Sequence, residues 1–200
     1  MALVDANYNF IALDVGSYGK NSDGGIFANS NLGKRLQQGT LGIPGNSLLP
    51  GTSIETPHVI VGDEAFPLKT YLMRPYPGQN LNGDKRIFNY RLSRARRIVE
   101  NTFDILTQKF RIYNRRINQA NPENVDNIVL ATCILHNFIK YFNPNTTHDY
   151  EGNQPHTSSL LETVQPQSGN ATAGAFHVRE VFKNYFISEA GSVPWQEDKI

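Results

Sequence analysis

Residues 88–110 read FNYRLSRARRIVENTFDILTQKF and have the longest and clearest periodicity in the sequence. Its larger apolar residues recur every three or four positions, which is the spacing of one stripe along an α-helix. They are Phe88, Leu92, Ala95, Val99, Phe103, Leu106 and Phe110. The first acid of the stretch, Glu100, follows a cluster of arginines. These are Arg91, Arg94, Arg96 and Arg97. We therefore predict a long amphipathic helix with a dense basic surface beside one carboxylate.

Two interpretations of Glu100 are open on the helix alone. The first is a surface glutamate paired with Arg96 or Arg97, which precede it by four and three residues; such pairs contribute only about 0.2–0.5 kcal/mol. The second is a functional acid. Residues 58–66, HVIVGDEAF, favour the second, because a β-branched apolar run there ends at Asp63. We predict a buried strand with an acid at its carboxyl end, where α/β proteins commonly place functional groups.

The net charge of +1 hides an uneven distribution along the chain. Ten basic residues and two acids lie in the segment from Lys85 to Arg116. The rest of the chain contains nine basic and sixteen acidic residues. A basic element within an acidic body favours a polyanion as partner. Solvation of a helix face by its arginines is an equally consistent explanation, and the charge pattern alone leaves both open.

The single cysteine, Cys133, excludes an intramolecular disulfide and favours a reducing compartment. It lies in an apolar helical run, so we expect a core position. His136 lies in the same run and is expected to pack through a hydrogen bond rather than to act as a ligand. No run reaches the ~18 apolar residues of a membrane span, and no signal peptide pattern opens the chain. We expect a soluble protein inside the cell or nucleus.

The remaining chain alternates between predicted elements and loops. Residues 2–15 predict two strands around a turn, and residues 26–37 predict a weak helix. Asn121 and Pro122 mark the start of a helix that runs through Phe142. Its expected buried face consists of Val125, Ile128, Val129, Thr132, Leu135, Phe138 and Phe142. A polar segment, 143–175, predicts a flexible linker before a short closing helix at 176–186. Trp195 in the tail can either dock on the fold or remain free.

Four segments, taken together, have the order of a known family. They read VDANYNFIALDVGSYGKNSDGGIF, VGDEAFPLKTYLMRPYPG, FNYRLSRARRIVENTFDILTQKFRIY and IVLATCILHNF. In that order they resemble the DDE nuclease domain of the PIF/Harbinger transposases and of the proteins derived from them. The resemblance implies an α/β fold, a ribonuclease H-like mixed sheet flanked by helices, here without its first strand. It implies a partial DDE endonuclease domain over 1–142, then the linker 143–175 and a helix and tail over 176–200.

The resemblance also implies a chemistry. Asp63 matches the second catalytic acid of the family and Glu100 the third, in an R-x-x-E-x-x-F motif, and both would bind divalent metal. Two metal ions then activate the nucleophile and stabilise the leaving oxygen of a phosphodiester displacement, and carboxylate oxygens suit Mg or Mn. The four arginines Arg91, Arg94, Arg96 and Arg97 would hold the DNA backbone or brace the fold.

The first acid of the family lies on a strand upstream of the hairpin that opens this chain. Neither Asp5 nor Asp14 occupies its place, so we expect cleavage by the chain alone to be impaired. The leading expectation is a transposase-derived, metal-dependent endonuclease domain that acts on DNA. The alternative is a non-catalytic DNA-binding or protein-binding module. The resemblance further implies a nuclear location and a separate Myb-like DNA-binding partner. An oligomer is compatible with the sequence, which leaves the oligomeric state open.

Overall fold

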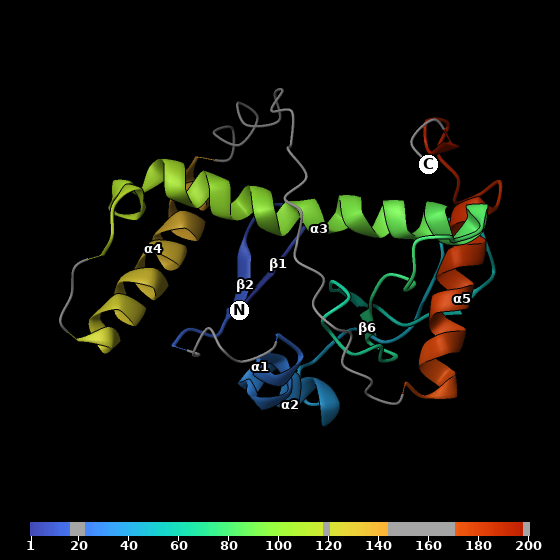
Figure 1. Ribbon diagram of the computed structural model, residues 1–200, viewed down its shortest axis with the longest axis horizontal. Helices are drawn as coiled ribbons and strands as arrows, with labels where there is room; N and C mark the ends of the chain where they lie inside the picture. Colours follow the sequence, from blue (N-terminus) through green and yellow to red (C-terminus); the bar gives the residue numbers. More distant parts are fainter. Residues whose placement is uncertain (17–22, 118–120, 144–170, 198–200) are drawn as a thin grey trace. The chain divides into compact units, whose positions relative to one another are not determined.

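The computed structural model of the chain describes residues 1–16, 23–117, 121–143 and 171–197. In these residues it is a mixed α/β structure with five α-helices, one 3-10 helix and three two-stranded sheets (Figure 1). It divides into two compact units. The first takes in the described residues of Met1–Asn21 and Arg97–Val164, and the second those of Ser22–Arg96 and Gln165–Ile200. The boundary falls within the longest helix, α3 (Gly83–Lys109), which is the helix predicted from the arginine-rich stretch.

The first unit opens with the predicted hairpin. Strands β1 (Ala2–Val4) and β2 (Phe10–Leu13) pair antiparallel. Asp5 closes the turn between them, because its Oδ1 accepts the backbone N–H groups of Asn7 and Asn9 at 2.8 and 2.9 Å. An aspartate side chain that bonds the backbone two residues on replaces a backbone turn contact. The local turn chemistry therefore fixes where the first strand ends.

The helix α4 (Pro122–Phe142) packs against β2 of the same unit. Its start is the predicted one, since the Asn121 side chain accepts the N–H of Glu123 and proline occupies the first turn. The Asn137 side chain accepts the N–H of Phe10 and donates to its C=O, at 2.9 and 2.8 Å. An asparagine thus pairs with β2 as a neighbouring strand would. A short 3-10 helix, Arg111–Asn114, lies between α3 and α4 in the sequence.

The structure confirms the predicted core positions of two residues of α4. Cys133 is buried in a small apolar cluster with Phe10 and Leu106. His136 is fully buried, and its Nε2 lies 2.8 Å from the carbonyl oxygen of Tyr8. Because a carbonyl can only accept, Nε2 carries the proton. His136 is therefore a packing residue, as the sequence indicates, and it ties α4 to the hairpin.

The predicted buried face of α4 is wrong in its second half. Leu135, Phe138 and Phe142 are 47%, 59% and 62% exposed. Their neighbours His136 and Asn137 face the hairpin instead, because both bond backbone groups of β2 or of the turn before it. Polar contacts therefore decide the rotation of a helix whose apolar residues occupy both faces.

The second unit begins with two short helices. The predicted helix over 26–37 is in fact α1 (Asp23–Asn29) and α2 (Asn31–Gln37), separated at Ser30. The Ser30 hydroxyl oxygen accepts the N–H of Gly33 at 2.9 Å, so it caps α2 and ends the first helix. A serine that offers this bond interrupts a helix that apolar spacing alone would continue.

Four short strands follow in the same unit. The pair β3 (Ser47–Leu48) and β4 (Glu55–Thr56) is antiparallel, and the pair β5 (Ile60–Val61) and β6 (Leu72–Met73) is parallel. Strand β5 is the predicted strand before Asp63, but it is only partly buried rather than buried as predicted. Strand β6 lies between Pro67 and Pro75 in the sequence.

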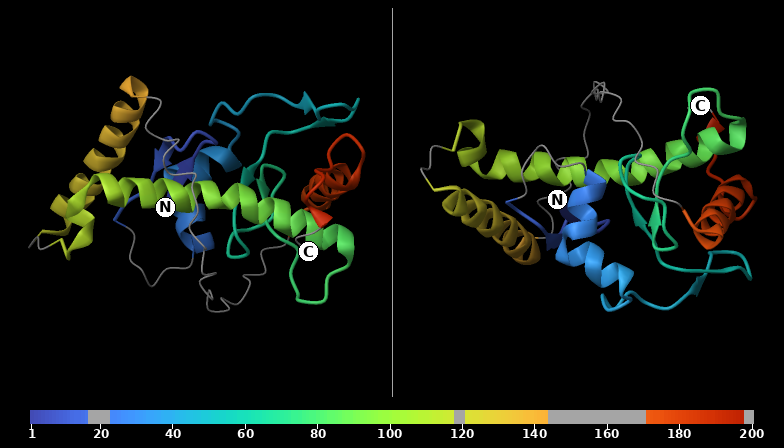
Figure 2. Two further views of the ribbon diagram at one scale, coloured as in Figure 1. Left: turned by 90° about the horizontal axis from the view of Figure 1, so that it is seen from above. Right: turned by 60° about the horizontal axis from the view of Figure 1, so that its bottom comes forward.

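The main core of the second unit joins α3 to the C-terminal helix α5 (Ala173–Ile187). Phe88 and Leu92 of α3 are buried against Ala175 and Val178 of α5. In every view α5 lies at the N-terminal end of α3 (Figure 1 and Figure 2). Most of the expected linker, residues 144–170, lies outside the described residues, and α5 begins earlier than predicted. No helix among the described residues is both long and apolar enough to cross a membrane.

Candidate active site and arginine surface

Asp63 is positioned by the end of β5 and the turn after it. The backbone N–H of Gly62 donates to the carbonyl of Met73 at 2.9 Å, which extends the pairing of β5 with β6. A side chain at Gly62 would meet the Phe66 ring at 3.0 Å, so the close packing of this turn favours glycine. Asp63 Oδ1 then accepts the N–H of Ala65 at 2.9 Å. These contacts fix the carboxylate at the predicted place, directly after the strand.

The second oxygen of Asp63 faces an arginine of α3. Oδ2 lies 3.7 Å from Nη2 of Arg96, and the two side chains are 29% and 22% exposed respectively. The distance makes this an ion pair without a close hydrogen bond. Pairs that remain in contact with water typically contribute about 0–1 kcal/mol. The structure thus brings together one predicted catalytic acid and one predicted DNA-binding arginine.

Glu100 and Arg97 belong to the other unit. Both side chains are exposed on α3. Asp63, Arg91, Arg94 and Arg96 belong to the second unit. The unit boundary therefore separates the two acids that the sequence predicts to act together.

The donor chemistry of Asp63 suits a divalent metal. Carboxylate oxygens are the ligands that Mg and Mn prefer, and each oxygen of Asp63 has a lone pair beyond the contact described above. Among the described residues, however, no group of three or more His, Cys, Asp or Glu side chains gathers as a metal site would. Asp63 therefore fits as one ligand, and the described residues around it do not form a complete set.

The guanidinium of Arg91 contacts the C-terminal segment of the chain. Its Nη1 donates to the carbonyl oxygen of Gly191 at 3.2 Å and to Oε1 of Gln196 at 3.1 Å. Its guanidinium also lies over the Phe186 ring, 4.7 Å from the centroid. Burial lowers the pKa of Arg91 below the usual arginine value. Of the two roles expected for this arginine, bracing the fold is the one for which the structure supplies contacts.

Arg94 contacts the tail in a different way. Its guanidinium carbon lies 4.3 Å from the ring centroid of Trp195. The Tyr90 ring packs against the same indole in a T-shaped contact, with 6.1 Å between centroids. Trp195 docks on α3, which decides the alternative that the sequence leaves open. Arg94 itself is exposed. Sequence reasoning missed this contact, because nothing in the chain links an isolated tryptophan to one particular arginine.

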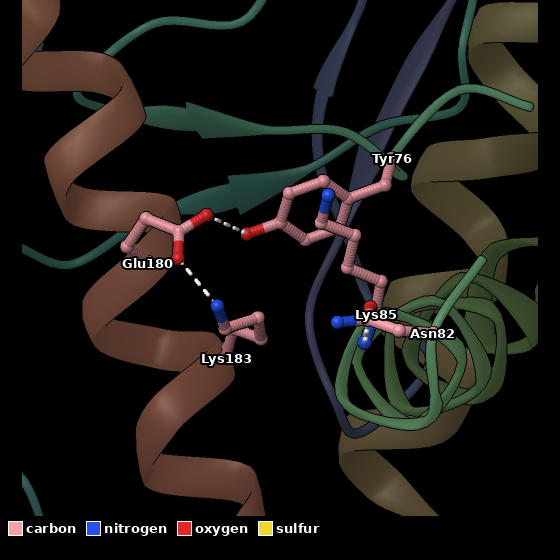
Figure 3. Close-up of polar contacts among 5 residues, drawn as sticks. All are labelled: Tyr76, Asn82, Lys85, Glu180 and Lys183. Atoms are coloured by element: carbon pink, nitrogen blue, oxygen red, sulfur yellow. Dashed lines mark hydrogen bonds and ion pairs between the residues drawn. The ribbon is translucent and has the colours of Figure 1, made fainter.

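A second polar cluster joins α5 to the loop after β6 (Figure 3). The Tyr76 hydroxyl donates to Oε1 of Glu180 at 2.6 Å, and Lys183 pairs with the other oxygen of the same carboxylate. Lys85 and Arg179 place their cationic groups 5.3 and 4.0 Å from the centroid of the Tyr76 ring. Burial, and then the contact with Glu180, raises the pKa of Tyr76 well above its ordinary value. Sequence reasoning missed this cluster as well, because it joins residues from separate segments.

Comparison with known proteins places this architecture in a family context. Residues 1–137 match the family described as DDE superfamily endonuclease. The chain is 28% identical over 155 residues to the Arabidopsis thaliana protein named "Protein ALP1-like", a match that covers 78% of the chain and 38% of that protein. It is 34% identical over 80 residues to the proteins named "Putative nuclease HARBI1" in Homo sapiens and Bos taurus, which covers 39% of the chain and 23% of theirs. The chain therefore spans less than two fifths of the length of these curated relatives. No solved structure matches the chain.

Proposed function

Because this chain belongs to the DDE superfamily endonuclease family, we propose that it acts on DNA as a transposase-derived, metal-dependent endonuclease domain that cleaves phosphodiester bonds. The observation that carries the proposal is Asp63, held by its turn at the carboxyl end of β5. A carboxylate fixed directly after a short parallel strand is a common arrangement for functional acids in α/β proteins. The proposal extends to the fold, which we assign to the ribonuclease H-like class.

The proposed metal ligands of this chain are Asp63 and Glu100. Their assignment is supported by the family match and by their motifs, and DDE superfamily endonucleases are generally dependent on divalent metals. A bound Mg or Mn ion supplies Lewis acidity at a phosphoryl oxygen and lowers the pKa of bound water. Asp63 contributes an oxygen already oriented by the N–H of Ala65. That oriented side chain has less freedom to lose when it binds an ion.

The proposed DNA contacts lie on the basic part of α3. Arg94 and Arg96 are the candidates for phosphate contact in the second unit, and Arg97 is the candidate in the first. We assign Arg91 to bracing, since two hydrogen bonds and an aromatic ring already engage its guanidinium. A nuclear location and a separate Myb-like DNA-binding partner complete the proposal, as the family resemblance implies, and an oligomer is compatible with it.

A non-catalytic DNA-binding module is the second candidate function. The ion pair between Asp63 and Arg96 favours it, because a guanidinium beside the carboxylate competes with a metal ion for the same oxygen. The two candidates share the DNA contacts and differ in cleavage. An assay for DNA cleavage therefore distinguishes the two candidate functions.

The test is nicking of supercoiled plasmid by the purified chain in Mn²⁺, beside Asp63→Asn and Glu64→Gln. Glu64 is the matched control because it is an exposed acid next to Asp63. The endonuclease proposal predicts weak nicking by the wild type and by Glu64→Gln, because one of the family's three acids has no match in the chain, and loss of that nicking in Asp63→Asn. Plasmid that is bound but never nicked would instead support the non-catalytic module.

A further inference from the structure

The C-terminal residues 171–197 lie beyond the part of the chain that matches the family, yet they help to build the second unit. Gln196 is 3% exposed and anchors the tail. Its Nε2 donates to the carbonyl of Phe186 at 2.9 Å, and its Oε1 accepts from the N–H of Val193 and from Arg91. Trp195 precedes this anchor directly. Its indole is therefore held beside α3 by the buried glutamine that follows it.

Arg91 and Arg94 lie one helical turn apart on α3 but are used differently. Hydrogen bonds to Gly191 and Gln196 occupy donors of Arg91. Arg94 lies over the indole of Trp195, and its guanidinium makes no hydrogen bond or ion pair within the described part of the chain. A contact between a guanidinium and an aromatic face uses none of the five N–H donors. The tail therefore restrains Arg94 and leaves its donors for another partner.

We propose that Trp195 is a positioning residue that holds Arg94 ready to donate to a phosphate of the DNA backbone. The inference rests on the DNA-binding part of the proposed function. A planar guanidinium fork matches the oxygens of a phosphate, and an exposed arginine otherwise loses rotamer freedom when it binds. Stacking on Trp195 already restricts the rotamers of Arg94 in the free protein, so less rotamer freedom is lost when DNA binds. The indole itself makes no contact with DNA in this proposal.

The expected size of the effect follows from counterion release. Each phosphate contact steepens the dependence of log K on log salt by about 0.9 for duplex DNA. One contact is therefore worth about eightfold in affinity at ~0.1 M salt. Loss of Arg94 should cause this decrease and flatten the salt slope by about one contact. Loss of the aromatic face at position 195 should cause part of the same decrease, because Arg94 must then be ordered on binding.

The experiment measures fluorescence anisotropy of a labelled DNA duplex with the full chain between ~50 and ~200 mM salt. The variants are Arg94→Ala, Trp195→Leu, Trp195→Phe and the double variant Arg94→Ala/Trp195→Leu. Leucine retains apolar bulk without an aromatic face, and phenylalanine retains the face. Tyr141→Ala is the matched control, because Tyr141 is an aromatic residue that is 80% exposed on α4. Thermal unfolding of each variant reports whether the second unit remains folded.

The proposal predicts that Trp195→Leu weakens binding while Trp195→Phe and Tyr141→Ala bind like the wild type. It also predicts that the double variant binds no more weakly than Arg94→Ala. Wild-type affinity in Trp195→Leu, or additive losses in the double variant, would overturn this inference and leave the proposed function standing. If the wild type shows no salt-dependent binding of DNA, the DNA-binding part of the proposed function fails and the inference fails with it. Should Trp195→Leu unfold, Trp195→Gln takes its place because it also lacks the aromatic face: weaker binding than the wild type is expected, and wild-type affinity would overturn the inference.

Discussion

Oδ2 of Asp63 lies 3.7 Å from Nη2 of Arg96, so the acid that follows β5 is paired with an arginine of α3. The pair joins two residues that the sequence assigns to different roles, one to metal and one to DNA. A cation at this distance opposes the approach of a metal ion to the same oxygen. We therefore expect the arginine to weaken the proposed binding of metal by Asp63.

Replacement of Arg96 by glutamine should strengthen the binding of Mn²⁺. Removal of one partly exposed unit charge near the carboxylate is worth about 0–1 kcal/mol, which corresponds to an increase in affinity of up to about fivefold. Isothermal titration calorimetry measures the change. Arg35→Gln is the control, because Arg35 is an exposed arginine on α2. Unchanged or weaker Mn²⁺ binding by Arg96→Gln would mean that the pair does not limit metal access.

His136 should make the stability of the first unit depend on pH. Burial lowers its pKa below the ordinary value of 6.5, so the folded chain binds the proton less readily than the unfolded chain. The stability that the folded chain gains from neutral His136 is fully present above pH 6.5 and is lost as the pH falls below 6.5. Urea unfolding midpoints between pH 5 and pH 8 measure the loss. His136→Gln retains an N–H donor for Tyr8 without titrating in this range, so its midpoint should vary less with pH. An equal pH dependence in both proteins would assign the effect to other groups.

Asn137→Ala should destabilise the hairpin. The Asn137 side chain bonds both backbone polar groups of Phe10, and its removal leaves them without these partners. The expected cost is about 1–3 kcal/mol in the free energy of unfolding, measured by urea denaturation. Asn127→Ala provides the control because Asn127 is exposed on the same helix. If the two variants are equally stable, water replaces the asparagine at no cost.

Tyr76→Phe should weaken the attachment of α5. It removes a hydroxyl that donates to Glu180 at 2.6 Å, and a hydrogen bond to a charged group contributes about 1.5–3 kcal/mol when it is buried and less when it is partly exposed. The pKa of Tyr76 is raised above 10.0, so the unfolded chain releases the phenol proton first as the pH increases. Stability should therefore fall above pH 10 in the wild type and fall less in Tyr76→Phe. Denaturation at pH 7 and at pH 10.5 separates the two effects, and identical profiles would rule out this role of the hydroxyl.

Local chemistry made some elements predictable from the sequence. Asp5 and the residues after it specify the first turn, and Asn121 with Pro122 specifies the start of α4, because each signal acts within a few residues. The rotation of α4 was not predictable, since apolar residues line both its faces. The contact between His136 and Tyr8 decides that rotation, and it joins residues separated by 128 positions.

In the candidate site, too, local signals were predictable from the sequence and contacts between distant residues were not. The position of Asp63 after a strand follows from its apolar run and the glycine before it. Its partner Arg96 could not be chosen among four neighbouring arginines, because the spacing within α3 does not show which side chain faces β5. The contacts of Arg91 with Gly191 and Gln196 join residues about a hundred positions apart, and the polar composition of the tail gives no sign of them.

The central claim is that Asp63 and Glu100 bind a divalent metal, and thermal unfolding during titration with Mn²⁺ tests it most directly. Metal at about 100 times its Kd adds about 2.7 kcal/mol to stability, which should raise the wild-type midpoint by about 5–10 °C. Glu64→Gln should show the same rise, whereas Asp63→Asn and Glu100→Gln should show little or none. If Mn²⁺ leaves the wild-type midpoint unchanged, or raises it equally in all four proteins, these two acids are not its ligands.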